Sequence, residues 1–229
     1  MTPGGPSAVR ELDEVVIRKA SVGSMDNNAY LLTCRVSRSQ LLVDAADEPD
    51  RLLELVREGS GGARLDVVVT THGHPDHHRA LEPVVAVTGA LTAAGADDAA
   101  DIPVPTKRRL AHGDVLVVGH LTLEVVGLRG HTPGSVALVY REPVRGVDGP
   151  RGVDAVPGRV HLFTGDSLFP AGVGNTGRDP VRFERLLTDV TERLFDRFDD
   201  SASVYPGHGA DTTLGAERPH LAEWRRRGW

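Results

Sequence analysis

The order of apolar and polar positions divides the chain into strand-like and helix-like segments. Apolar and β-branched runs predict strands in the first half of the chain at residues 14–22, 28–36, 40–45 and 65–71. Similar runs predict strands in the second half at residues 114–119, 121–128, 135–142, 160–169 and 201–208. Helical spacing predicts helices over residues 48–59, 77–89 and 180–198, the second of them broken or kinked near Pro83.

Two rounds of strands followed by helices predict an α/β fold in which two packed sheets carry helices on their outer faces. Residues 142–159 are rich in Gly, Pro and charge and predict a long surface hairpin loop. No other segment resembles a linker. We therefore expect a flexible N-terminus over residues 1–12 and a single domain over residues 13–229.

Composition narrows the classes of partner. The formal net charge of −6 over 229 residues gives no basic field for a phosphate backbone, so we expect no nucleic-acid partner. No run approaches the roughly 20 apolar residues of a membrane span, and the first residues do not resemble an export signal. The single cysteine, Cys34, agrees with a reducing compartment. We expect a cytoplasmic protein without a membrane partner.

The stretch "THGHPDHH", residues 71–78, directly follows an apolar strand and predicts a metal site. Residues two apart in an extended chain point the same way, so His72 and His74 can bind one ion. Asp76 and His77 lie on the turn into the next helix and can reach a second ion. Imidazole and carboxylate ligands suit zinc, and also iron or manganese. The absence of cysteine from the stretch favours a catalytic site over a structural one.

Three further candidate ligands lie downstream, each where a strand ends beside a glycine. They are His131 in "RGHTPGS", Asp166 in "FTGDSLF" and His208 in "YPGHG". A neighbouring glycine lets the backbone approach closely, as a buried metal site requires. The ordered set is a stronger signal of a metal site than any of its members.

The ordered motifs T-H-x-H-x-D-H, G-H-T-P-G-S, T-G-D and P-G-H-G resemble those of the metallo-β-lactamase superfamily, and most closely its glyoxalase II-like hydrolases. The resemblance implies an αββα four-layer sandwich, with two mixed sheets flanked by helices and a site at the edge where the sheets meet. It also implies that Asp166 bridges two ions. The remaining ligands divide into one set for the first ion and one for the second: His72, His74 and His131; Asp76, His77 and His208.

The implied activity is metal-dependent hydrolysis of a small thioester, such as a hydroxyacyl thiol, by a hydroxide that bridges two divalent ions. Zinc is the first expectation for these ions, with iron or manganese as alternatives. Asp76 and Asp166 are the candidate catalytic residues. A thiol leaving group, with a pKa of about 8.5, can depart without an acid to protonate it. Asn175 and Arg178 in "FPAGVGNTGRDP" are expected to shape the pocket for this small-molecule substrate.

Departures from the glyoxalase II pattern leave alternatives open. Only residues 209–229 follow His208, whereas glyoxalase II carries a glutathione-binding helical domain there, so the carrier thiol could be glutathione, mycothiol or another thiol. A persulfide dioxygenase would hold a single iron through residues matching His72, His131 and Asp166. A lactonase and a non-catalytic metal-binding scaffold are the remaining alternatives.

Overall fold

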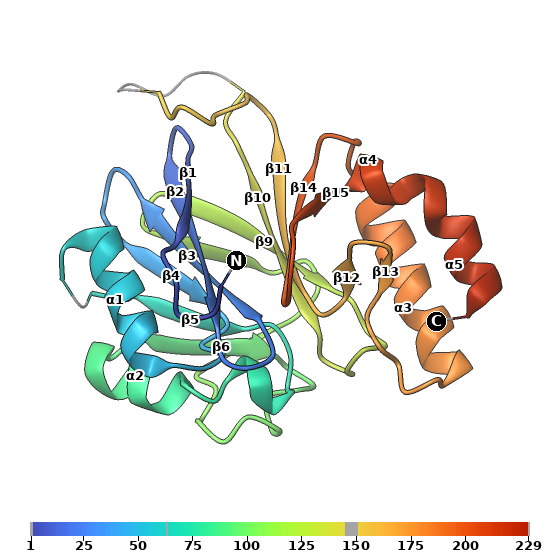
Figure 1. Cartoon of the computed structure of the whole chain (residues 1–229), viewed down its shortest axis with the longest axis horizontal. Coiled ribbons are helices and arrows are strands. Elements are labelled where there is room, and N and C mark those ends of the chain that lie inside the picture. The colour runs from blue at the N-terminus through green and yellow to red at the C-terminus, as the bar shows by residue number, and fades with distance from the viewer. Residues whose placement is uncertain (1, 63, 145–150, 229) are drawn as a thin grey trace.

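The computed structural model describes residues 2–62, 64–144 and 151–228 and arranges them in four layers (Figure 1). A seven-stranded sheet packs face to face against a six-stranded sheet. Helices α1 and α2 lie on the outer side of the first sheet, and α3, α4 and α5 lie on the outer side of the second. The expected α/β sandwich of two mixed sheets flanked by helices is therefore confirmed.

The first sheet combines an antiparallel half with a parallel half. Its strands follow one another in chain order, antiparallel from β1 to β4 and parallel from β4 to β7. Because β4, β5 and β6 run parallel, their carboxyl ends meet at one edge of the sheet, which is where open α/β sheets place their sites. The strands are β1 (Ala8–Glu11), β2 (Val15–Val22), β3 (Asn27–Cys34), β4 (Gln40–Val43), β5 (Val67–Thr70), β6 (Leu91–Gly95) and β7 (Arg108–Leu110).

The second sheet has the order β15-β14-β11-β10-β9-β8. Only β11 and β14 are parallel to each other; the other neighbours are antiparallel. The parallel pair brings the carboxyl ends of β11 and β14 side by side. The strands are β8 (Val115–Val118), β9 (Leu121–Gly127), β10 (Val136–Arg141), β11 (Val160–Gly165), β14 (Ser203–Pro206) and β15 (Thr212–Thr213), with a small separate hairpin of β12 (Leu168–Phe169) and β13 (Gly172–Val173).

The α-helices connect and cover the strands. They are α1 (Pro49–Ser60), α2 (Leu81–Thr88), α3 (Pro180–Val190), α4 (Leu214–Glu217) and α5 (Leu221–Arg227). A π-helical turn, Thr191–Phe195, extends α3, and a 3-10 turn, Arg218–His220, joins α4 to α5. Within the described ranges, no helix has the length and apolar character needed to cross a bilayer.

The apolar sequence pattern is explained by three buried layers. Val67 and Val69 of β5 point into the core between the sheets, whereas Val68 points toward α1 and α2. A strand that is covered on both faces needs apolar residues at every position, which accounts for the continuous run. Leu186 of α3 and Trp224 of α5 are buried in the third layer, between the second sheet and its helices. Each fully buried large apolar side chain contributes about 1.5–3 kcal/mol to stability.

The structure corrects the helix expected over residues 77–89. Residues Pro75–His77 form a 3-10 turn, η1, and α2 begins only at Leu81. Pro83 therefore lies in the first turn of α2, where its missing N–H costs no hydrogen bond, and the helix is not broken there. The sequence patterns also did not predict β6 and β7. The Ala-Ala-Gly end of β6 has low strand propensity, and its pairing with β5 and β7 overrides that propensity.

Within the N-terminal residues 1–12, Ala8–Glu11 pair with β2 as β1. The expected flexibility of this terminus stays a prediction. The N–H of Asp154 donates to the carbonyl oxygen of Glu11 at 3.0 Å, so β1 also contacts the expected hairpin loop. Within that loop, residues 145–150 lie outside the described residues, and residues 151–159 contain no helix or strand. The assignment of residues 13–229 to a single domain stays a prediction.

Candidate metal centre

The predicted ligands lie on loops that leave the carboxyl ends of neighbouring strands. The loop after β5 carries His72 and His74, and the short turn η1 carries Asp76 and His77. The other three lie on loops of the second sheet. His131 lies between β9 and β10, Asp166 directly follows β11, and His208 follows shortly after β14. Because the two sheets pack together, these four loops meet at one edge of the sandwich.

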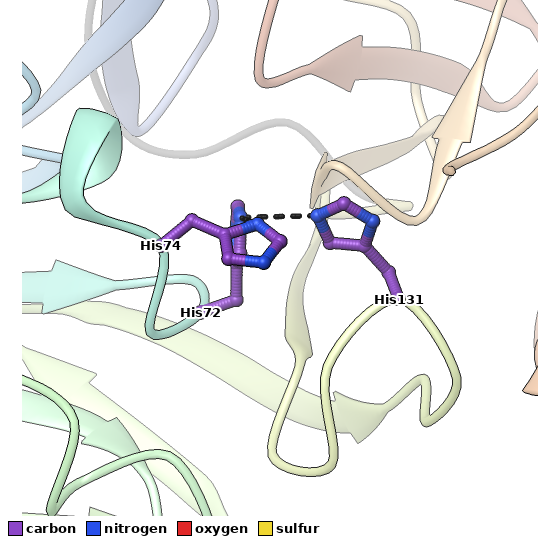
Figure 2. Close-up of side chains that lie close together, drawn as sticks. All are labelled: His72, His74 and His131. Carbon is purple, nitrogen blue, oxygen red and sulfur yellow. Dashed lines mark hydrogen bonds between the residues drawn. The ribbon is translucent and has the colours of Figure 1, made fainter. Parts of the chain in front are cut away.

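Three imidazole rings form a first cluster, composed of His72, His74 and His131. The Nε2 atom of His72 lies 3.1 Å from Nδ1 of His74 and 3.2 Å from Nε2 of His131. Figure 2 shows that His131 approaches from its own loop toward the two rings of the other loop. Three imidazole nitrogens that converge on one point are a ligand set for a transition-metal ion.

Burial keeps two of these histidines neutral. His72 is 1% exposed and His131 is 5% exposed. Burial lowers the pKa of His72 well below its ordinary value, and the nearby His77 adds to this effect. Burial also lowers the pKa of His131, although Asp166 opposes the shift. Neutral imidazole is the form that binds a metal ion, so the first cluster is ready to bind one at neutral pH.

Asp76, His77 and His208 form a second cluster beside the first. The Oδ2 atom of Asp76 lies 3.6 Å from Nε2 of His77 and 3.3 Å from Nε2 of His208. Burial raises the pKa of Asp76, but a hydrogen bond from Asn27 and the neighbouring His77 outweigh burial and leave it below its ordinary value. The carboxylate is therefore ionised, and the second cluster offers one anionic and two imidazole ligands.

Asp166 lies between the two clusters. Its Oδ2 atom is 3.7 Å from Nε2 of His131 and 3.5 Å from Nε2 of His208, and its Oδ1 atom is 3.4 Å from Nε2 of His77. Burial raises the pKa of Asp166, but the neighbouring His208 and His77 outweigh burial and hold it well below its usual range. This ionised carboxylate contacts members of both clusters.

The second cluster has a negative electrostatic environment. Burial opposes protonation of His77, yet the carboxylates of Asp44 and Asp166 raise its pKa to about 10. The pKa of His208 is also raised, because the nearby Asp166 outweighs the effect of burial. The same carboxylates that attract a proton to these rings attract a metal cation, so the second cluster favours positive charge.

The hydrogen bonds of four histidines orient their Nε2 lone pairs toward the centre. Nδ1 of His77 donates to Asp44 at 2.9 Å, Nδ1 of His131 donates to the carbonyl oxygen of Asn175 at 2.7 Å, and Nδ1 of His208 donates to that of Met25 at 2.9 Å. Nδ1 of His72 lies 3.1 Å from the hydroxyl oxygen of Thr71, and this hydroxyl donates its own hydrogen bond to Asp44. Oxygen partners of this kind are typical of metal-bound histidines.

These residues fit a metal ion. The Nε2 lone pairs of His72 and His131 face each other at 3.2 Å, an arrangement that is repulsive unless a cation or a proton lies near both. Nε2 of His77 and Oδ1 of Asp166, which lies between the clusters, are both buried without a hydrogen-bond partner. Buried polar atoms are nearly always satisfied, and a metal ion would satisfy these two.

Sequence reasoning missed Asp44, which follows β4 and is 1% exposed. Its Oδ1 atom accepts the N–H of Thr71 at 2.7 Å, and its Oδ2 atom accepts the Thr71 hydroxyl at 2.8 Å in addition to Nδ1 of His77. The signal in the sequence was an acidic residue directly after the apolar run of β4. Because β4 and β5 are parallel neighbours, that residue lies beside the loop that carries the ligands.

Asn27 is a second missed residue. Its side-chain amide donates to the backbone oxygen of Asp76 at 2.9 Å and to Oδ2 of the same residue at 3.0 Å. Asn27 is fully buried at the start of β3, so it holds the Asp76 carboxylate in a fixed direction. An asparagine at a strand start gave no distinct signal, because turns commonly contain asparagine.

A pocket lies next to the segment that packs against His131 and Asp166. It has a volume of about 740 Å³ and is lined by Val173, Gly174, Asn175, Thr176, Arg178 and Gly228. A Cβ atom at Gly174 would collide with the backbone oxygen of Asp166 and come within 3.2 Å of Nδ1 of His131, so this wall packs directly on the site. Asn175 and Arg178, the two expected substrate-binding residues, both lie on this wall.

Comparison with curated proteins finds relatives named hydroxyacylglutathione hydrolase. A hydroxyacylglutathione hydrolase from Anaeromyxobacter dehalogenans (strain 2CP-C) is 34% identical over 189 residues, which cover 80% of this chain and 61% of that protein. The hydroxyacylglutathione hydrolase GloC from Haemophilus influenzae is 26% identical over 199 residues, which cover 79% of this chain and 85% of that protein. The chain spans about half to two thirds of the length of the first curated relatives it matches.

A solved structure and a family model also match this chain. The crystal structure of TTHA1623 in a di-iron-bound form is 28% identical and aligns with a TM-score of 0.65, covering 87% of this chain and 96% of that one. The family model described as "Metallo-beta-lactamase superfamily" matches residues 22–209, which include all seven members of the site. On this match and on the fold, the chain belongs to the metallo-β-lactamase superfamily.

Proposed function

We propose that this protein hydrolyses a small thioester at a centre of two divalent metal ions. The observation that carries the proposal is the position of Asp166, an ionised carboxylate between two separate clusters of ligand atoms. In this proposal, His72, His74 and His131 hold the first ion. Asp76, His77 and His208 hold the second ion, and Asp166 contacts both.

The choice of ion follows from the donor set. Imidazole nitrogens and carboxylate oxygens suit zinc, which we propose first, and also iron or manganese. When bound, such a pair of ions acts as a Lewis acid toward a water molecule and toward the substrate carbonyl. The di-iron form of TTHA1623 supports a centre of two ions and keeps iron in consideration.

The residues of the chain supply the conditions for this chemistry. Asp44 and the backbone oxygens of Met25 and Asn175 fix the direction of three histidine rings, so no ring needs to reorient when substrate binds. Asp76 and Asp166 stay ionised and compensate the positive charge of the ions. We propose that Asn175 and Arg178 contact the substrate, because both line the neighbouring pocket.

A thioester is the favoured substrate for two reasons. A thiol with a pKa of about 8.5 leaves as an anion, so no acid is needed at the leaving-group side. The curated relatives reported above are named hydroxyacylglutathione hydrolases, which supports a hydroxyacyl thioester. The carrier thiol stays open between glutathione, mycothiol and another small thiol. A lactone would be attacked by the same chemistry and is the nearest hydrolytic alternative.

The second cluster argues against a dioxygenase with a single iron. Such an enzyme would need only His72, His131 and Asp166, yet Asp76, His77 and His208 converge as a separate ligand set. Hydrogen bonds with Asn27, Asp44 and Met25 orient these three side chains in the way expected of ligands for a second ion. The same observation, together with the adjoining pocket, argues against a scaffold without activity.

Elemental analysis combined with a substrate panel tests the proposal. We expect two zinc, iron or manganese ions for each chain, and turnover of a hydroxyacyl thioester of glutathione or mycothiol that exceeds turnover of a lactone. One iron per chain with oxygen consumption on a glutathione persulfide would instead establish the dioxygenase. Two bound ions without turnover of thioester, lactone or persulfide would establish the inactive scaffold.

A further inference from the structure

A buried carboxylate outside the ligand set joins the two loops of the first cluster. Asp98 lies in the turn after β6 and is fully buried. Its Oδ2 atom accepts the N–H of Gly73 at 2.9 Å and the hydroxyl of Thr132 at 2.5 Å, and its Oδ1 atom accepts the N–H of Gly134 at 2.6 Å. One side chain therefore accepts three hydrogen bonds from two loops.

These two loops carry all three histidines of the first cluster. Gly73 lies between His72 and His74, and Thr132 directly follows His131. The carbonyl oxygen of Gly73 also accepts a hydrogen bond from Nε2 of His78 at 3.3 Å, so hydrogen bonds hold this residue at both its N–H and its carbonyl group. Among the described residues, no hydrogen bond of Asp98 reaches the second cluster, whose members are oriented by Asp44, Met25 and Asn27.

Glycines permit the close approach of the Asp98 turn. A Cβ atom at Gly134 would collide with the backbone nitrogen of Asp98 and lie 2.8 Å from its carboxyl carbon. A Cβ atom at Gly95, at the end of β6, would collide with the carbonyl oxygen of Gly134. The glycine of the "HTPG" stretch is therefore needed for contact between this loop and the Asp98 turn. Three backbone segments meet at the buried carboxylate.

We propose that Asp98 is a positioning residue for the first metal site. By joining the two loops, Asp98 sets the distance between His131 and the pair His72 and His74. The inference rests on the metal centre of the proposed function, and it does not depend on which substrate is hydrolysed. Without the carboxylate, the N–H groups of Gly73 and Gly134 and the hydroxyl of Thr132 lose a shared acceptor. The loops can then separate, and the three imidazoles no longer converge.

Zinc affinity measured one cluster at a time tests this role. His208→Ala weakens the second cluster and leaves the first intact, whereas His131→Ala does the reverse. Adding Asp98→Ala to His208→Ala is expected to weaken zinc binding about 10–100-fold, the usual effect of removing a partner that orients metal ligands. Adding it to His131→Ala is expected to change zinc binding by less than about threefold. Competition with a zinc chelator gives both affinities without any substrate.

Two milder variants keep the test decisive if Asp98→Ala does not fold. In Asp98→Asn, the amide oxygen can replace Oδ2 and keep the bonds from Gly73 and Thr132, so zinc binding at the first cluster should weaken less than in the alanine variant. Thr132→Val removes one hydroxyl and leaves the carboxylate in place, so it should weaken the same cluster alone. Circular dichroism and thermal unfolding establish that each variant is folded.

Asp13→Ala is the matched control. Asp13 is also a buried carboxylate, and it accepts the N–H of Gly152 at 3.0 Å away from the metal centre. It should leave zinc affinity unchanged in both backgrounds. Equal weakening of both clusters by the Asp98 variants, or no weakening in a folded protein, would overturn the proposal.

The outcome for Asp98 can be distinguished from the outcome for the proposed function. Selective loss at the first cluster in a protein that hydrolyses no thioester would support the role of Asp98 and contradict the thioester assignment. Thioester turnover with unchanged zinc affinity in folded Asp98 variants would contradict the role of Asp98 alone. A parent protein that binds no zinc, iron or manganese would overturn both.

Discussion

The two clusters at the edge of the sandwich differ in charge although they share Asp166. The first cluster consists of imidazoles, and burial lowers the pKa of His72 and His131. The second cluster includes an aspartate, and Asp44 helps to raise the pKa of His77 to about 10. Burial alone makes a histidine neutral, whereas burial beside carboxylates makes it prefer a positive charge. Neighbouring sites on one edge can therefore bind cations with different dependence on pH.

The difference originates in the buried carboxylate that supports each cluster. Asp98 bonds to backbone N–H groups and a hydroxyl, so its charge is shared with the loops of the first cluster and not with a ring. Asp44 bonds directly to a ring nitrogen of His77. One carboxylate sets the distance between loops, and the other sets the charge and direction of a ligand.

Removing the shared carboxylate should have the largest effect. Asp166→Ala is expected to lower metal content at both clusters and to reduce hydrolysis by more than about 100-fold, since even an outer partner of a ligand costs 10–100-fold. Metal analysis and steady-state kinetics measure the two effects, with Asp13→Ala as the folded control. A variant with full metal content and full rate would rule out Asp166 as the shared ligand.

Removing Asp44 should act mainly on the second cluster. Asp44→Ala leaves Nδ1 of His77 without its acceptor, so zinc affinity measured in the His131→Ala background should fall about 10–100-fold. The effect in the His208→Ala background should be smaller, because Asp44 reaches His72 only through Thr71. Chelator competition gives both values. A larger loss at the first cluster would reverse the assignment of the two carboxylates.

Acidification should release the two ions in order. His72 and His131 have lowered pKa values and stay unprotonated until the pH falls below about 6.5, the ordinary histidine value. His77 and His208 have raised pKa values, so protons compete for the second cluster at higher pH. As pH falls, the second ion should leave before the first.

Dialysis from pH 8 toward pH 4 followed by metal analysis measures this order, with an intermediate plateau of one ion per chain. In single-cluster variants, His208→Ala should retain its ion to a lower pH than His131→Ala. Simultaneous release would contradict the electrostatic contrast. Metal content that stays flat down to roughly pH 4 would argue against histidine ligands altogether.

The smallest effect is expected in the pocket. Arg178→Ala should raise KM roughly twofold to fivefold with little change in kcat, because an exposed charge contributes less than about 1 kcal/mol. Arg185→Ala removes another exposed arginine, on α3 and outside this pocket, and should change neither constant. A large fall in kcat for Arg178→Ala would assign this residue a role in the chemical step rather than in binding.

Sequence patterns predicted the larger elements because these elements bury regular apolar faces. The prediction for α1 rested on Leu52, Leu55 and Val56, and all three are buried. The prediction failed for β6, whose Ala-Ala-Gly end has no strand preference and is held by its neighbours β5 and β7. It also failed for Pro83, because proline is equally compatible with the first turn of a helix and with a break.

The residue types that can serve as ligands, and their order along the chain, were evident from the amino-acid sequence. Four of the ligands are close together in the chain: His72, His74, Asp76 and His77. Local backbone conformation, first extended and then a turn, is enough to bring them near one another. The downstream residues His131, Asp166 and His208 were identifiable because each follows a strand and adjoins a glycine.

The hydrogen bonds that hold those ligands became evident only from the folded structure. Asp44 contacts Thr71 and His77, and Asp98 contacts Gly73, Thr132 and Gly134, across loops that are far apart in the chain. The carboxylate oxygens of these two aspartates accept hydrogen bonds mostly from backbone N–H groups and hydroxyls. Every loop offers such donors, so no sequence pattern identifies the loops that each aspartate contacts. Parallel strand order and the packing of the two sheets bring these groups together. That arrangement leaves buried imidazoles of the first cluster neutral and places those of the second cluster beside carboxylates.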